Sequence, residues 1–280
     1  MKSIAVLLTV FNRKEKTLQC LSNLFNQEIP QGYSLDVYLT NDGCTDGTPQ
    51  AVKELFPQVK IIDGDGNLFW NRGMWTAWDA ASKAKDYDFY FWLNDDTFLY
   101  DEAVLKLVNT SIKYEDKAII VGVTESLDKT HTTYGGRIPK KGIPEVNGEE
   151  SKCVSFNGNI VLIPKYVYDS IGKMDPYYSH SYGDFDYGFT ATKYNVAIYQ
   201  TGTYLGACDE HPTLSTWCNP EVPLRKRWMA LHRPNGQPPK EVFHFESKFL
   251  GVRKAIFHYF TTYLHCLVPQ LWGVLGKARK

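Results

Sequence analysis

The stretch of residues 89–97, FYFWLNDDT, decides the fold and carries the strongest signal in the chain. Its five consecutive apolar residues predict a strand that is buried on both faces, as strands of parallel sheets are. Two carboxylates, Asp95 and Asp96, follow this strand at its end. Buried paired acids are unfavourable unless a cation meets them, and hard divalent cations prefer oxygen ligands. The stretch therefore predicts either a cation site or, alternatively, a solvated turn.

Strand and helix signals alternate on both sides of this stretch, throughout the first 120 residues. Such alternation predicts a mostly parallel sheet that is covered by helices on both faces. In sheets of this kind, ligands bind beyond the carboxyl ends of the strands. The predicted strands are 4–10, 35–40, 59–62, 88–93 and 118–123, and the predicted helices are 14–26, 48–56, 71–84 and 102–114.

The second half of the chain has weaker signals. Residues 125–152 are polar and predict a loop or hairpin, and a helix is expected near 165–171. Residues 212–245 are rich in proline and predict irregular structure. Apolar residues then recur at spacings of three and four over 247–267, which predicts one helix that ends before Pro269.

Charge is distributed unevenly along the 280 residues. Residues 1–221 contain 20 Lys and Arg against 29 Asp and Glu, whereas residues 222–280 contain 11 against 2, so the net charges of −9 and +9 cancel. A basic, aromatic C-terminal segment is typical of chains with anionic partners such as phospholipid headgroups or a lipid diphosphate. The alternative is that this basic segment folds onto the acidic body.

Cysteine spacing and hydropathy indicate a cytoplasmic protein. The six cysteines are scattered without a CxxC pair, which argues against a disulfide framework or a zinc site and fits a reducing compartment. The apolar run 4–8 is too short for a signal peptide and predicts a first strand. The sequence contains no run of about 18 apolar residues, so no membrane-spanning helix is expected.

Two glycine-rich segments follow the second and third predicted strands. The first, 41–48, is NDGCTDGT, in which the carboxylates could accept hydrogen bonds from a base or a ribose; the alternative is a plain turn capping a helix. The second, 63–74, is DGDGNLFWNRGM, where a helix start and Arg72 suit an anion such as a diphosphate. Its alternative is a tight loop with Phe69 and Trp70 in the core.

Three later segments carry further polar candidates. Residues 156–159, FNGN, offer amide groups to hydroxyls or form a turn. In 180–187, HSYGDFDY, Asp184 and Asp186 share one side of an extended chain but diverge on a helix. One carboxylate there could serve as a general base, or it could cap a helix. His211 could be a nitrogen ligand for a metal, although a lone histidine is usually structural.

Taken in order, these segments resemble a family 2 inverting glycosyltransferase of the GT-A fold. The similarity extends from residue 3 to about residue 215. It is closest in character to bacterial enzymes that build surface polysaccharides, many of them rhamnosyltransferase-like. No single segment is specific, but their order and spacing are. The matching segments are 9–13, 41–48, 66–73, 93–97, 157–159 and 183–187.

The resemblance implies the fold and the domain limits. It implies an α/β, Rossmann-like nucleotide-diphospho-sugar transferase with a mixed, mostly parallel sheet, helices on both faces and a C-terminal helical appendage. The catalytic domain is expected over 1–220, with a nucleotide-sugar half at about 1–123 and an acceptor half at about 124–220. Residues 221–280 are expected to form a basic, aromatic extension with an amphipathic helix.

The resemblance also implies roles for single residues. Asp184 matches the catalytic base and Asp96 matches the ligand of Mg²⁺ or Mn²⁺, with His211 as a further candidate ligand. The expected acceptor-binding residues are Asn157, Gly158, Asn159 and Asp186. The expected donor-binding residues are Thr9, Phe11, Asn12, Arg13, Asn41, Asp42, Gly66, Asn67, Asn71, Arg72, Asn94 and Asp95.

Four positions depart from the pattern of the family, and one of them is Gly183, where a glutamate often precedes the base. Asn41 replaces the first acid of a usual pair, which leaves Asp42 as the expected base-binding residue. Asn94 replaces the first acid of the DxD-like triplet, so the metal is expected mainly on the last acid and on phosphate oxygens. Thr190 stands where an arginine often occurs, and Arg72 is the expected substitute for its diphosphate contacts.

The implied activity is the transfer of a sugar, with inversion, from a nucleotide-diphosphate donor to a hydroxyl of a glycan or lipid-linked acceptor in cell-surface polysaccharide synthesis. Expected donors are dTDP-rhamnose or a UDP-hexose, and no nucleic-acid partner is expected. Asn94 and Thr190 favour an alternative, a sugar-nucleotide-binding module without turnover. A nucleotidyltransferase is a weaker alternative because 9–16 lacks a glycine-rich loop.

The apolar and basic stripe over 247–272 suggests an amphipathic helix that rests on a membrane surface near a lipid-linked acceptor. The protein would then be cytoplasmic and peripheral on the inner face of the membrane. The alternatives are a helix that packs on the catalytic domain and one that forms a contact between two subunits.

Overall fold

The computed structural model describes residues 1–210 and 215–270. Its contacts divide the chain into two compact units, one of residues 1–176 and 183–210, the other of residues 177–182 with 211 onward. Each unit is described below by itself. The domain limit at residue 220 stays a prediction.

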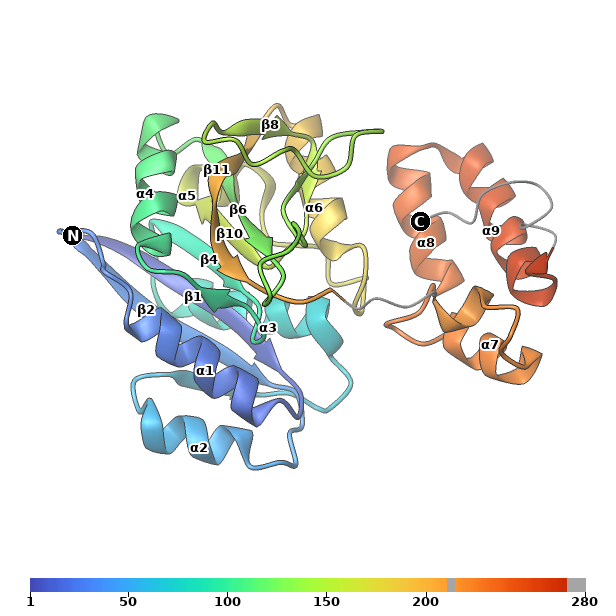
Figure 1. Cartoon of the computed structure of the whole chain (residues 1–280), viewed down its shortest axis with the longest axis horizontal. Coiled ribbons are helices and arrows are strands. Elements are labelled where there is room, and N and C mark those ends of the chain that lie inside the picture. The colour runs from blue at the N-terminus through green and yellow to red at the C-terminus, as the bar shows by residue number, and fades with distance from the viewer. Residues whose placement is uncertain (211–214, 271–280) are drawn as a thin grey trace. The chain divides into compact units, whose positions relative to one another are not determined.

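The first unit is built around one mixed sheet (Figure 1). Strands β3, β2, β1 and β4 are parallel neighbours in that order, and β10, β6, β11 and β5 continue the sheet, with β8 on β11. Only β10, β5 and β8 oppose the common direction, so the predicted mixed, mostly parallel α/β sheet is confirmed. The strands are β1 Lys2–Val10, β2 Tyr33–Asn41, β3 Lys60–Asp63, β4 Phe89–Leu93, β5 Phe98–Leu99, β6 Ala118–Glu125, β8 Ser151–Cys153, β10 Ile160–Pro164 and β11 Ala197–Ala207.

Helices cover both faces of this sheet because side chains alternate along each strand. On β1, Ile4, Val6 and Leu8 pack with helices α1, α2 and α4, whereas Ala5 and Leu7 face helices α3, α5 and α6. A small second sheet pairs β7 Gly136–Arg137 with β9 Ser155–Phe156. The helices are α1 Lys14–Phe25, α2 Thr48–Leu55, α3 Phe69–Ala84, α4 Ala103–Lys113, α5 Lys165–Ile171 and α6 Gly183–Lys193.

The parallel register brings the candidate segments to one edge of the sheet. Val10 lies opposite Asn41, and Asn41 lies opposite Asp63, so β1, β2 and β3 end side by side. Strand β4 runs parallel to β1 and ends at Leu93. Consequently the loops that follow these four strands share the carboxyl edge, as the alternation of strands and helices predicts.

The second unit is helical, and here two predictions were wrong. Helices α7 Leu224–Leu231 and α8 Pro239–Phe249, with a short 3-10 turn at Thr216–Cys218, lie in the segment predicted to be irregular. Pro239 is the first residue of α8, a position where the backbone N–H has no partner within the helix, so the missing N–H of proline costs nothing. Proline in this segment therefore marks a helix start rather than a loop. The single helix predicted over 247–267 is two helices, because Gly251 has a φ of +90° between α8 and α9 Val252–Leu267.

Packing between these helices uses buried polar groups. Arg227 of α7 donates from Nε to the carbonyl of Cys266 (2.9 Å) and from Nη2 to that of Leu267 (3.2 Å), which caps the C-terminal end of α9. His258 of α9 meets both carboxylate oxygens of Glu246 of α8 at 2.8 Å. Over the described residues, no helix is long and apolar enough to cross a bilayer.

Candidate functional site

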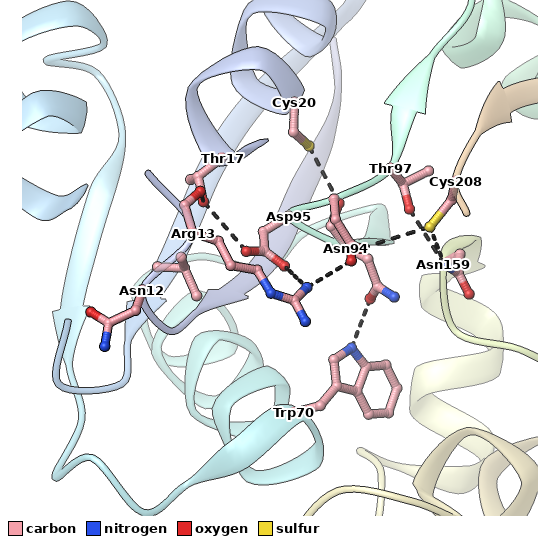
Figure 2. A network of polar contacts seen from close by, with 12 residues as sticks. Asn12, Arg13, Thr17, Cys20, Trp70, Asn94, Asp95, Thr97, Asn159 and Cys208 are labelled. Atoms are coloured by element: carbon pink, nitrogen blue, oxygen red, sulfur yellow. Dashed lines mark hydrogen bonds and ion pairs between the residues drawn. The ribbon is translucent and has the colours of Figure 1, made fainter. Parts of the chain in front are cut away.

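The acidic pair at the end of β4 is held by an arginine from the loop after β1 (Figure 2). Nη1 of Arg13 lies 2.7 Å from Oδ2 of Asp96 and 3.2 Å from Oδ1 of Asp95. The side chain of Asp95 is 8% exposed and that of Asp96 13%, whereas that of Arg13 is 40% exposed. The positive charge that two nearly buried carboxylates require is therefore supplied by the chain itself.

The acidic pair is further enclosed by Thr17 on one side and by Cys208 on the other. Burial raises the pKa of Asp95 to about 7, against the opposing effect of Arg13. Thr17 donates from Oγ1 to Oδ2 of Asp95 at 3.4 Å. On the other side, Sγ of Cys208 lies 3.8 Å from Oδ1 of Asp96, and burial raises the pKa of this thiol to about 12, so it stays a neutral thiol.

Asn94 joins this pair to an aromatic side chain. Nε1 of Trp70 donates to Oδ1 of Asn94 at 2.7 Å, and the backbone N–H of Asn94 donates to the carbonyl of Asn159 at 3.1 Å (Figure 2). The Trp70 ring meets Trp92 edge-on, with 6.1 Å between ring centroids. The side chain and the backbone of Asn94 therefore tie the acidic pair to Trp70 and to the start of β10.

Asp184 begins α6, and its carboxylate is bound by two backbone amides. Oδ2 accepts from the N–H of Gly158 at 3.1 Å, and Oδ1 accepts from that of Phe185 at 2.8 Å. Burial raises the pKa of Asp184 to about 6, while these amides and the charge of Arg137 oppose the rise. A carboxylate with such a pKa is poised to accept a proton near neutral pH.

The two acidic centres are linked by contacts through three residues. Gly158, which binds Asp184, has no room for a side chain, since a Cβ there would lie 2.6 Å from the Trp70 ring. Trp70 in turn donates to Asn94, the residue before the acidic pair. Both centres therefore lie at the same edge of the sheet, joined through Gly158, Trp70 and Asn94.

Asp42 has a different environment from the one expected for a residue that binds a base. The residue is 3% exposed, and its carboxylate accepts from the backbone N–H groups of Gly66 (2.9 Å), Leu68 (3.1 Å) and Phe69 (2.9 Å). Its neighbour Asn41 donates to Oδ1 of Asp63 at 2.9 Å. In this structure Asp42 anchors the loop that leads to Trp70, and its predicted role in binding a base stays a prediction.

Replacing Asp42 with Ala is expected to lower the free energy of unfolding by about 2–4 kcal/mol, because three backbone amides would lose a charged, buried acceptor. Urea denaturation measures this change. Asp65→Ala is the control, since exposed Asp65 of the same loop accepts one backbone bond, from Asn67. Equal, small losses for both variants would show that Asp42 does not hold the loop.

The remaining predicted donor residues line the ends of β1 and α3. Phe11 is 55% exposed, and Oδ1 of Asn12 accepts from the N–H of Thr45 at 2.8 Å. Thr9 is buried against Gly73, whose hydrogen in place of a side chain permits the contact. Further along, Asn67 is exposed, Asn71 donates to the carbonyl of Asp175 at 2.8 Å, and Arg72 donates to that of Pro176 at 3.1 Å.

Three of the predicted acceptor residues directly precede β10, and the fourth lies in α6. Asn159 donates from Nδ2 to Oγ1 of Thr97 at 3.4 Å, and Oδ1 of Asn157 accepts from Nε of Arg137 at 3.0 Å. Asp186 is buried in α6, away from the exposed face of that helix. The helix separates Asp184 from Asp186, so only the first binds Gly158. His211 lies outside the described residues.

Sequence reasoning missed two residues of this site. Arg137 comes from the polar segment predicted to be a loop or hairpin, where nothing marks one basic residue among several. Cys208 was noted only for its spacing from other cysteines. Trp70 lies in the predicted anion-binding segment 63–74, for which the alternative was a loop with Trp70 in the core. The structure shows that its ring packs on Trp92 and that its indole N–H also donates to Asn94. No local pattern signals these pairings, because each joins residues far apart in sequence.

Mg²⁺ or Mn²⁺ has a plausible but incomplete set of ligands here. Among the described residues, no group of three or more His, Cys, Asp or Glu side chains is placed to hold a metal ion. The hard oxygens of Asp95 and Asp96 nevertheless suit such an ion, and their pairing with Arg13 shows that this spot requires positive charge. The residues therefore fit a metal that takes its other ligands from a bound anion.

The family model for glycosyl transferase family 2 matches residues 5–167, which run from within β1 to beyond β10 and include the acidic pair. This match covers more than half of the chain. The protein belongs to glycosyl transferase family 2.

Solved structures with a similar fold include a fragment of TarS from S. aureus, residues 1–349. The form in complex with UDP-GlcNAc gives a TM-score of 0.56 at 13% identity, covering 88% of this chain and 81% of that one. The form in complex with UDP gives 0.55 at 15% identity, covering 89% and 71%. A third structure, GalNAc-T7 with UDP, GalNAc and Mn²⁺, gives 0.56 at 11% identity, covering 72% and 42%.

These likenesses establish the fold, which is the expected GT-A type. The matched part is 60% of the chain in one structure of TarS 1–349 and 43% of TarS itself. No curated protein sequence matches the chain significantly.

Proposed function

We propose that this protein is an inverting glycosyltransferase that moves a sugar from a nucleotide-diphosphate donor to an acceptor hydroxyl. The observation that carries the proposal is the linkage of the Asp95–Asp96 pair to Asp184 through Trp70 and Gly158. Membership of family 2 supports the reaction class, and the UDP and UDP-GlcNAc in the TarS structures support the donor class.

In the proposed mechanism, Asp184 is the general base. One of its carboxylate oxygens takes the proton of the acceptor hydroxyl. At the same time, the hydroxyl oxygen of the acceptor attacks the anomeric carbon. The bond from this carbon to the diphosphate oxygen breaks, and a single displacement inverts the configuration. The backbone N–H groups of Gly158 and Phe185 fix the carboxylate during the transfer.

The donor side of the mechanism rests on the acidic pair. Asp96, assisted by Asp95, would hold Mg²⁺ or Mn²⁺, which when bound supplies Lewis-acid neutralisation of the leaving diphosphate. The hydrogen bond from Trp70 to Asn94 fixes the residue that precedes this pair. The proposed donors are UDP-hexoses and dTDP-rhamnose, and the proposed acceptor is a glycan or a lipid-linked glycan in cell-surface polysaccharide synthesis.

A panel of nucleotide sugars with Mn²⁺ tests this proposal. A thermal-shift measurement identifies donors, because a ligand that binds the native state raises the melting temperature. Mass spectrometry of a mixture with candidate acceptors then detects transfer, and free sugar reveals hydrolysis. Binding without transfer or hydrolysis for every donor would instead support a sugar-nucleotide-binding module.

We also propose that the second unit binds an anionic membrane surface, which would place the enzyme at the inner face of the membrane. Large apolar side chains on α9 are exposed, among them Phe257 at 64% and Phe260 at 68%. The two acids of residues 222–280, Glu241 and Glu246, are buried, so the exposed charges of the described part of this segment are basic. An apolar face bordered by basic residues suits anionic lipid headgroups.

Replacing Phe257 and Phe260 with Ser is expected to reduce the fraction of protein that floats with vesicles of anionic phospholipid about tenfold, since each aromatic ring contributes apolar area to binding. Tyr194→Ser is the matched control, because Tyr194 is an exposed aromatic residue of the first unit. Equal flotation of the double variant and the wild type would refute the membrane proposal; a concentration-dependent mass in solution would instead indicate contact between two copies.

A further inference from the structure

Arg13 occupies the acidic pair in a way that competes with a metal. Its Nη1 contacts one oxygen of each carboxylate, and the same oxygens are the hard ligands that a divalent cation requires. A guanidinium and a doubly charged ion so close together repel each other. A metal ion that takes these same oxygens must therefore displace the guanidinium.

The anchoring of Arg13 allows its side chain to leave while its backbone stays. Its carbonyl accepts from both the N–H (2.9 Å) and Oγ1 (3.0 Å) of Thr17, which fixes the backbone at the start of α1. The side chain is 40% exposed, and over the described residues its guanidinium bonds go to the two carboxylates alone. It extends from the carboxyl edge of the sheet, the edge at which a diphosphate of the donor would lie.

We propose that Arg13 is an exchangeable counter-ion. It pairs with Asp95 and Asp96 in the free protein, and it moves to the donor diphosphate when Mg²⁺ or Mn²⁺ takes the acidic pair. This inference rests on the proposed function. It predicts that the free protein binds metal weakly, and that metal and nucleotide diphosphate bind cooperatively because Arg13 gains a partner only when both are present.

The test measures the affinity of the free protein for Mn²⁺, by the loss of the electron paramagnetic resonance signal of free Mn²⁺. Arg13→Met is expected to bind Mn²⁺ about tenfold more tightly than the wild type, and to bind UDP in the presence of Mn²⁺ about tenfold more weakly. These opposite changes distinguish exchange from a role in binding UDP alone, which would leave the Mn²⁺ affinity of the free protein unchanged.

Two control variants locate the effect. Lys16→Met removes a nearby positive charge from an exposed position of α1 and should leave both affinities within a factor of about 3, which excludes a general effect of charge. Asp96→Asn should abolish the tight Mn²⁺ binding if the ion lies at the acidic pair. Arg13→Gln, which can still donate to the carboxylates, serves if the Met variant does not fold.

The inference is overturned if folded Arg13→Met and Arg13→Gln bind Mn²⁺ no more tightly than the wild type, or if Asp96→Asn binds it equally well. Because Mn²⁺ affinity of the free protein involves no sugar, this result is independent of whether the donor panel shows transfer. A protein without transfer can still confirm the exchange, and an active enzyme can still refute it.

Discussion

Replacing Asp184 with Asn is expected to lower kcat by about 10²–10⁴-fold, the usual contribution of a general base. The amide keeps the shape of the side chain, and its oxygen can still accept from the N–H of Gly158, so folding and donor binding should be retained. Steady-state transfer assays with a donor selected by the thermal-shift panel measure the change, and thermal melting confirms that the variant is folded.

Asp169→Asn provides the matched control, because Asp169 is a carboxylate of α5 that pairs with Lys165 at the surface. Its kcat should equal that of the wild type. Near-native turnover of Asp184→Asn would show that another group removes the proton.

The same role predicts how activity depends on pH. A base works only when it is deprotonated, and burial raises the pKa of Asp184 to about 6. The kcat should therefore rise as pH increases through about 6 and level off above it. In Asp184→Asn the step near pH 6 should disappear, because the amide cannot take up a proton in this range.

Replacing Asp96 with Asn is expected to lower kcat by about 10³-fold, because Lewis-acid neutralisation of a leaving diphosphate is worth several kcal/mol and each 1.36 kcal/mol is tenfold. Excess chelator should reduce wild-type transfer to a similar extent, and Mn²⁺ should restore it. Chelator should then have little further effect on Asp96→Asn, since both changes remove the same contribution.

Two results would contradict this expectation. Wild-type transfer that persists undiminished in excess chelator would leave Arg13, rather than a metal, as the cation that meets the diphosphate. A loss in Asp96→Asn that Mn²⁺ at high concentration fully restores would place the metal mainly on Asp95 or on the donor.

The order of strands and helices in residues 1–123 is predictable from sequence because each element has a local signal. Buried parallel strands appear as short apolar runs, and the helices show apolar periodicity of three to four. The predicted strand 88–93 is β4 Phe89–Leu93, and the predicted helix 165–171 is α5. The break at Gly251 was missed because apolar spacing continues across it, and only the positive φ reveals the turn.

The candidate site could be predicted only in part. The carboxyl ends of β1, β2, β3 and β4 had to meet once the sheet was parallel, so the placement of the acidic segments at one edge followed. The hydrogen-bond partners of these side chains could not be predicted from the sequence. The carboxylate of Asp42 faces the amides of 66–69, and Trp70 is both a core ring and a donor to Asn94. Packing in three dimensions selects such partners.

The sequence by itself determined that two acids stand at the end of a buried strand, where either a cation or solvent must meet them, because local hydrophobicity and charge are properties of consecutive residues. Only the tertiary structure decided that the cation is Arg13, which is 83 positions away from Asp96, and that Asp184 is fixed by Gly158, which is 26 positions away. Partners so distant in sequence are selected by strand register and helix packing, which no local pattern specifies.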